Sequence, residues 1–137
     1  MDQSIVDMRN QLQAMSLEIE AALAGLTEAD LNKPANWTGK DTNVRFLLHR
    51  LTAHVLDHTL QIRKARRAMG IAPSETQMIL SQFMEAEAAM LGECAGLSAE
   101  QFEKGPAAGE WSAKQVLEHV LTTQKKALES IQAAASK

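Results

Sequence analysis

The chain contains an internal repeat, and this repeat constrains the fold more than any single motif does. Residues 25–33 resemble residues 96–104, and a proline follows each segment. A Trp-Thr-Gly-Lys run at 37–40 then matches a Trp-Ser-Ala-Lys run at 111–114, and a histidine follows in each copy. Because glycine, proline, tryptophan and histidine positions align together, we interpret the chain as a tandem duplication of a helix–long loop–helix unit.

Hydrophobic periodicity predicts one long helix on each side of each loop. Apolar residues recur at steps of three and four over residues 4–23, which is the spacing of an amphipathic helix. A second helix is predicted over 42–69, where Gly70 provides the usual C-terminal stop. Serine followed three residues later by glutamine is a capping box, and it begins a third helix at Ser74 and a fourth at Ser112.

Composition agrees with a helical fold. The hydrophobic fraction is 45%, and it comes mainly from Ala, Leu and Met, with no Tyr, which favours helix over strand. Short helical turns are expected inside the long loops, at 27–31 and 98–102. The sequence therefore predicts an all-α domain over 1–137, a four-helix bundle with repeats at about 4–69 and 74–135.

Net charge and cysteine content limit the kinds of partner and the cellular compartment that we expect for this chain. A formal net charge of −3 argues against nucleic acid as a partner. Basic residues do cluster at Arg63, Lys64, Arg66 and Arg67, which we interpret as the C-terminal end of a helix, where the dipole favours cations. The lone cysteine, Cys94, is interpreted as a small buried hydrophobe, with a reactive thiol as the alternative. With no signal peptide and no membrane-length apolar run, we expect a cytoplasmic protein that does not bind membranes.

The two tryptophans have a structural interpretation. Trp37 and Trp111 each come shortly before a predicted helix, where an apolar side chain can pack the start of the helix onto the core. Contact with a ligand is the alternative role for both residues.

Three of the four histidines are candidate metal ligands. His54 and His58 are one turn apart, so both imidazoles can face one point. With 100° per residue, His58 falls within roughly 60° of the centre of the apolar stripe, His54 at roughly 80° and His49 at roughly 140°. We therefore separate His49 from the site. His119, early in the fourth helix, supplies a third imidazole, and three histidines with an open fourth position are typical of a catalytic metal site.

These motifs resemble a known family. The run His-x3-His-x2-Gln-Ile at residues 54–62, continuing to an Arg-rich turn and Gly70, is similar to the last-helix motif of the DinB/YfiT-like metalloenzymes. Residues 111–119 resemble the family's other motif, a Trp-Ser start to a helix that carries one histidine. The resemblance covers about residues 12–131. The two motifs occur here in reversed order, which the pseudo-equivalence of the two repeats accommodates.

The resemblance implies a four-helix bundle that holds a divalent metal, nickel or zinc, with His54, His58 and His119. Asp57 and Gln61 are candidate outer groups, because ligating imidazoles usually donate their second N–H to an acceptor. The implied activity is thiol transfer or hydrolysis on a small molecule, with a low-molecular-weight thiol as the expected partner.

Two further expectations stay open at this point. Glu118 is a weaker candidate for the site, and we interpret it as a solvated surface carboxylate. The alternative to an enzyme is a non-catalytic helical interaction module without a functional metal. The Ala- and Met-rich segment over 4–23 can pack against a second copy of the chain, so a homodimer is one expected assembly.

Overall fold

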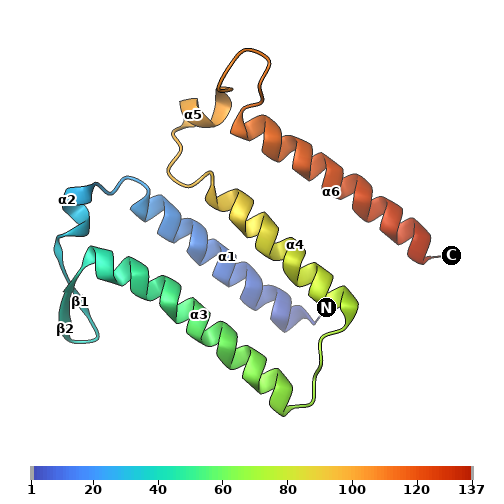
Figure 1. Ribbon diagram of the computed structural model, residues 1–137, viewed down its shortest axis with the longest axis horizontal. Coiled ribbons are helices and arrows are strands. Elements are labelled where there is room, and N and C mark those ends of the chain that lie inside the picture. The colour runs from blue at the N-terminus through green and yellow to red at the C-terminus, as the bar shows by residue number, and fades with distance from the viewer. Residues whose placement is uncertain (1, 137) are drawn as a thin grey trace. The chain divides into compact units, whose positions relative to one another are not determined.

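The computed structural model describes residues 2–136, and 71% of this range is helical, with six helices and one two-stranded sheet (Figure 1). The four predicted long helices are α1 (Gln3–Leu23), α3 (Val44–Ala68), α4 (Glu75–Gly92) and α6 (Ala113–Ala135). The two predicted helical turns are also present, as α2 (Glu28–Leu31) and α5 (Ala99–Glu103). No helix in the described range is long and apolar enough to cross a membrane. The helical class and the order of the helices are thus confirmed.

The chain divides into two units, and the division falls inside α4. Residues 2–88 form the first unit, which holds α1, α2, the small sheet, α3 and most of α4. Residues 89–136 form the second unit, which holds the end of α4, then α5 and α6. In the first unit, α2 and the sheet contact the N-terminal part of α3 (Figure 1). In the second unit, α5 packs against α6.

A β-hairpin occupies the first long loop, which the sequence had not predicted. Strand β1 (Pro34–Trp37) pairs antiparallel with β2 (Lys40–Asn43), and Trp37 lies opposite Lys40. The two connecting residues, Thr38 and Gly39, have positive φ angles of 51° and 82°. Positive φ at both central positions is the geometry of a type I′ turn, which matches the twist of paired strands.

The hairpin also moves the start of α3 and corrects the role assigned to Trp37. The sequence predicts a helix from residue 42 with Trp37 just before it, but Trp37 lies in β1 and the helix begins at Val44. Asn43 is the N-cap, and its Oδ1 accepts a hydrogen bond from the Phe46 N–H at 2.9 Å. The first repeat therefore starts its second helix with an asparagine cap after a hairpin, not with the Trp-Ser arrangement of the second repeat.

Reciprocal capping boxes begin four of the helices. Ser74 and Ser112, predicted as caps, accept hydrogen bonds from the backbone N–H of Gln77 and Gln115 at 3.2 Å each. The glutamine side chains accept from the serine N–H groups in return. The short helices use the same device, with Thr27 at α2 and Ser98 at α5. Each box satisfies two of the backbone donors that a helix start leaves without partners.

The capping boxes of α2 and α5 differ in the side chain that accepts a hydrogen bond from the N-cap N–H, and this difference predicts a pH response. In α2 the returning acceptor is Asp30, and hydrogen bonds from Lys33 and then from Thr27 hold the pKa of this carboxyl well below its usual value of 3.8. A depressed pKa means that the stability from this cap is fully present above the unfolded-state pKa of 3.8 and is lost as the pH falls from there toward the lower folded-state pKa. In α5 the acceptor is the Gln101 amide, which does not titrate. On acidification well below pH 3.8, through the depressed pKa of Asp30, the NMR signal of the Thr27 N–H should move as its carboxylate partner is protonated, while that of the Ser98 N–H should stay constant. Equal movement of both signals would contradict this assignment.

Most large apolar side chains of the long helices are exposed, and the others are half-buried. No hydrophobic residue in the range 2–136 is buried, and Ser112, at 2% exposure, is the single buried residue of that range. The apolar stripe of α3 is typical, because Val55 and Ile62 are 65% and 64% exposed. Trp111 is 54% exposed, so the predicted packing of this side chain into a core is not observed.

Candidate metal centre

His54 and His58 lie together on one side of α3. Their ring centroids are 4.3 Å apart and the rings are perpendicular to each other. Because α3 is continuous from Val44 to Ala68, side chains four residues apart lie on the same face of the helix, one turn from each other. Both side chains are exposed, so a ligand can reach the two imidazoles from solvent. The predicted adjacency of the two imidazoles is therefore present.

Gln61 sets the tautomer of His58. The Nδ1 atom of His58 and the Oε1 atom of Gln61 are 2.7 Å apart. An amide oxygen can only accept a hydrogen bond, so Nδ1 carries the proton and donates it. In the neutral ring, Nε2 then keeps the lone pair that a metal ion would bind. Gln61 thus makes the contact that sequence reasoning proposed for an outer group.

Asp57 contacts a different partner. Its Oδ2 lies 3.4 Å from Nη1 of Arg50, two turns earlier on α3. Among the described residues, no hydrogen bond joins Asp57 to either imidazole. Asp57 therefore holds Arg50, and Gln61 alone supports the histidine pair.

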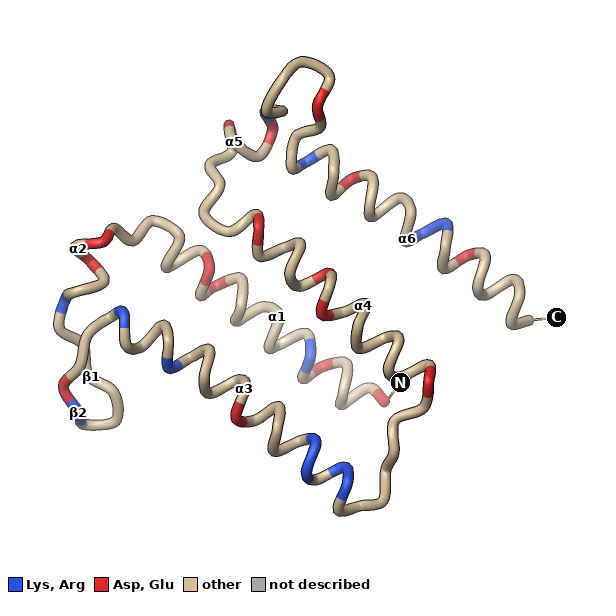
Figure 2. Tube along the Cα trace, in the orientation of Figure 1, with Lys and Arg blue, Asp and Glu red and all other residues tan. Residues whose placement is uncertain are grey.

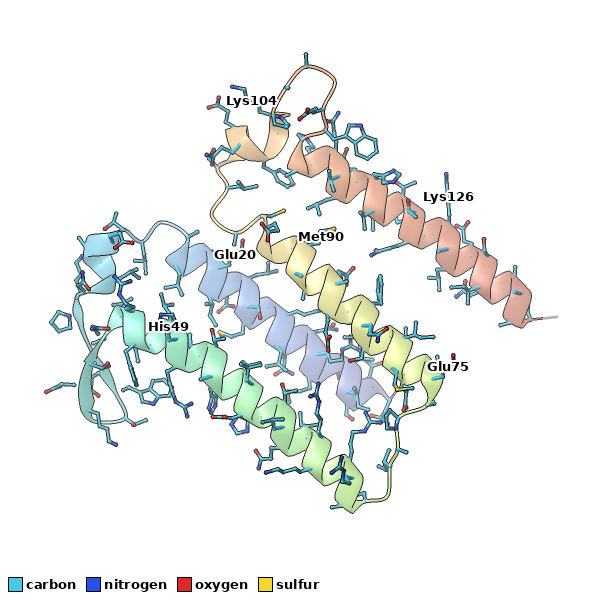
Figure 3. All side chains as sticks on the ribbon, in the orientation of Figure 1. Glu20, His49, Glu75, Met90, Lys104 and Lys126 are labelled. Atoms are coloured by element: carbon cyan, nitrogen blue, oxygen red, sulfur yellow. The ribbon has the colours of Figure 1, made fainter. Side chains whose placement is uncertain are left out.

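His49 lies on α3 nearer to its N-terminal end (Figure 3). It is exposed, and its ring makes no close ring contact with His54 or His58. Five residues separate His49 from His54, which rotates its side chain by about 140° around the helix. His49 is therefore a natural control for the pair.

His119 lies on α6, in the second unit, and has an aromatic neighbour. The centroids of the Trp111 and His119 rings are 4.9 Å apart, with the rings tilted by 58°. The Ser112 cap fixes the start of α6 directly after Trp111, so the indole reaches the helix surface two turns further on. Sequence reasoning missed this contact, although the Trp-Ser pair before the helix was the signal for it.

Glu118, next to His119, is exposed and its charge acts on a lysine of the same helix. Lys114 lies one turn before it, and Nζ of Lys114 is 2.9 Å from Oε1 of Glu103 in α5. The pKa of Lys114 is raised, first by the hydrogen bond to Glu103, then by the charges of Glu103 and Glu118. Lys114 is half-buried and Glu118 is exposed, so Glu118 is a solvated carboxylate, as its sequence interpretation held.

Cys94 lies outside any helix. It follows α4, in the turn after Gly92, and it is half-buried. The sequence interpretation of Cys94 was a small buried hydrophobe, and the observed burial is only partial. The preceding helix ends two residues earlier because the backbone turns through Gly96, which has a φ of 79°.

The donors on α3 fit a divalent ion. Two imidazoles one turn apart, one with its Nδ1 proton already bound to an acceptor, are suited to be two of the three ligands of a tri-histidine site. Within either unit, no three His, Cys, Asp or Glu side chains of residues 2–136 gather closely enough to hold a metal ion. His54 and His58 belong to the first unit and His119 to the second, so the complete ligand set stays a prediction.

Comparison with known proteins identifies no relative of this chain. No protein-family model matches it, no curated protein matches it, and no solved structure matches it. The DinB-like resemblance therefore stays a prediction based on its two motifs.

Proposed function

We propose that the chain is a divalent-metal-dependent enzyme of the DinB-like type, acting in thiol transfer or hydrolysis on a small molecule. His54 and His58 hold the metal together with His119, and nickel or zinc is the expected ion. The observation that carries the proposal is the histidine pair of α3, with its rings 4.3 Å apart and His58 oriented by Gln61.

The proposal includes a four-helix bundle formed by α1, α3, α4 and α6. Isolated helices of this length are marginally stable in water, and burial of an amphipathic face normally stabilises them. Each of the four helices has large apolar side chains available for such packing. Examples are Met8 and Leu12 of α1, Val55 and Ile62 of α3, Ile79 and Phe83 of α4, and Leu128 and Ile131 of α6.

Each protein group has a defined task in this proposal. A bound nickel or zinc ion supplies a Lewis acid that activates a thiol or a water molecule. Gln61 keeps the His58 proton on Nδ1, which presents Nε2 to the metal. The indole of Trp111 lies against the His119 ring at a tilt of 58° and restricts the rotation of that ring. These contacts reduce the freedom that the ligands must lose when the ion binds.

Elemental analysis of the full chain, purified without a histidine tag, tests the proposal. We expect about one nickel or zinc ion per chain, as a three-histidine site requires. Protein dialysed against a chelator and then reloaded with one equivalent of metal should recover the same content. Substoichiometric metal after reloading would overturn the proposal.

The second candidate is a non-catalytic interaction module, and the exposed apolar stripes favour it. A homodimer could bury the same side chains that a bundle buries, with no metal involved. This candidate expects a chain that dimerises in sedimentation experiments and whose stability is indifferent to chelator. The metal proposal expects stability that depends on the ion, whatever the oligomeric state.

A further inference from the structure

A cavity of about 670 Å³ lies in the first unit, where α3 connects to α4. Its volume is within the range of small-molecule sites, which is about 300–1,000 Å³. One part of its lining is basic, with Arg63, Arg66 and Arg67 from the last two turns of α3. Figure 2 shows Lys and Arg gathered at this end of α3. The rest is mostly apolar and includes Ile71 and Met78.

The arginines are not needed to complete the end of α3. The Ile71 N–H donates to the Arg66 carbonyl at 2.9 Å, and the Gly70 N–H donates to the Arg67 carbonyl at 3.0 Å. Gly70 has a φ of 70°, so these two bonds form a Schellman motif that satisfies the terminal carbonyls. The guanidinium groups of Arg66 and Arg67 are therefore not required as donors to these two carbonyls.

No carboxylate neutralises this cluster within the described part of the chain. Neither aspartate nor glutamate lines the cavity, and none of its three arginines forms an ion pair with a residue in the range 2–136. Arg66 is half-buried, and its Nη2 donates to Oε1 of Gln77 at 3.3 Å. Gln77 is itself held by the Ser74 N–H at 3.0 Å, so this guanidinium is held in place by the start of α4.

We propose that this cavity binds a phosphate monoester of a small apolar molecule. Three guanidinium groups offer paired N–H donors, the geometry that phosphate oxygens accept best. A phosphate monoester has a charge of about −1.5 to −2 at neutral pH, which suits a cationic cluster better than a single carboxylate does. The apolar wall, with Ile71, Pro73 and Met78, accommodates the organic part of the ligand. This site is separate from the histidine pair and does not depend on a metal.

Calorimetric titration of the full chain with phenyl phosphate tests the proposal. We expect saturable binding, and inorganic phosphate should bind at least about tenfold more weakly because it leaves the apolar wall unused. Arg67→Gln and Arg63→Gln should each weaken phenyl phosphate binding by about 10- to 100-fold, since each removes a charge-assisted hydrogen bond. Both side chains are exposed, and circular dichroism checks that the helical content is retained.

Lys64→Gln is the matched control, because Lys64 is in the same turn, has the same charge and does not line the cavity. It should weaken binding by less than about threefold, the size of a screened surface effect. An equal loss in Lys64→Gln and Arg67→Gln would overturn the site, as would the absence of saturable phenyl phosphate binding. Capture by phosphatidate-containing vesicles without binding of phenyl phosphate would also overturn it, in favour of a basic membrane-facing surface. Equal affinity for inorganic phosphate and phenyl phosphate would overturn the assignment of the apolar wall.

Discussion

His58→Ala is expected to abolish most of the metal-dependent thermal stability of the chain. When the free concentration of a metal ion is about 1,000 times its Kd, binding stabilises the folded protein by about 4 kcal/mol. For a chain of this length, that free energy corresponds to a rise in Tm on the order of 10 °C. Loss of a ligand should weaken binding by more than about 100-fold, because outer groups alone contribute about 10- to 100-fold. Scanning calorimetry with and without chelator should then give a large Tm difference for the wild type and a small one for His58→Ala.

Two further variants separate the metal site from general effects of losing a histidine. His49→Ala removes an exposed imidazole from the same helix, about 140° around from His54, and should leave the chelator-dependent Tm difference unchanged. Gln61→Ala removes the acceptor that holds the His58 Nδ1 proton, and it should give an intermediate difference. If His49→Ala and His58→Ala respond alike, the assignment of the pair is wrong. If chelator leaves the wild type unchanged, the interaction module is the better description.

Gly105→Ala should be the most destabilising single methyl addition in the loop between α5 and α6. A Cβ at this position would collide with the backbone carbonyl of Glu110, closer than van der Waals contact permits. A carbonyl in the backbone cannot rotate away as a side chain can, so the loop itself must move. This loop leads directly into Trp111 and the Ser112 cap of α6. We expect the free energy of unfolding, measured with urea, to fall by about 1–3 kcal/mol, which is the usual cost of forcing extra volume into a filled space.

Gly92→Ala is the matched control for that substitution. Gly92 is in the last turn of α4, its φ is not positive, and a Cβ there meets no atom within 4 Å. Alanine loses less backbone freedom on folding than glycine does, so the free energy of unfolding of this variant should rise by up to about 1 kcal/mol. Opposite signs for the two variants are the expected outcome. Equal destabilisation would show that the close approach at Gly105 is not what limits the loop.

Local rules predicted most of the secondary structure. The serine–glutamine pairs at Ser74 and Ser112 fix helix starts within the four residues of a capping box, so no tertiary information was needed. The hairpin escaped prediction because its turn uses Thr38 in the left-handed region, where a β-branched residue is rare. Gly39 was the one local signal for that turn, and an Asn-Gly or Asp-Gly pair would have been far stronger.

The candidate site was predictable only as far as one helix extends. The four-residue spacing of His54 and His58 brings their rings together on one side of α3. The three-residue spacing of His58 and Gln61 allows the hydrogen bond between their side chains. The Trp-Ser pair marked the start of α6, but the approach of the Trp111 ring to His119 also depends on how the loop turns into that helix, which residue spacing does not encode. The relation of His119 to the α3 pair depends on packing between helices, which residue spacing does not encode.

The most direct measurement is an anomalous-scattering map from a crystal of the full chain grown with nickel or zinc. We expect one strong peak with the ring nitrogens of His54, His58 and His119 at about 2.0–2.1 Å, the usual distance between zinc and imidazole nitrogen. A peak at other residues, or no peak at these three histidines in metal-loaded crystals, would contradict it.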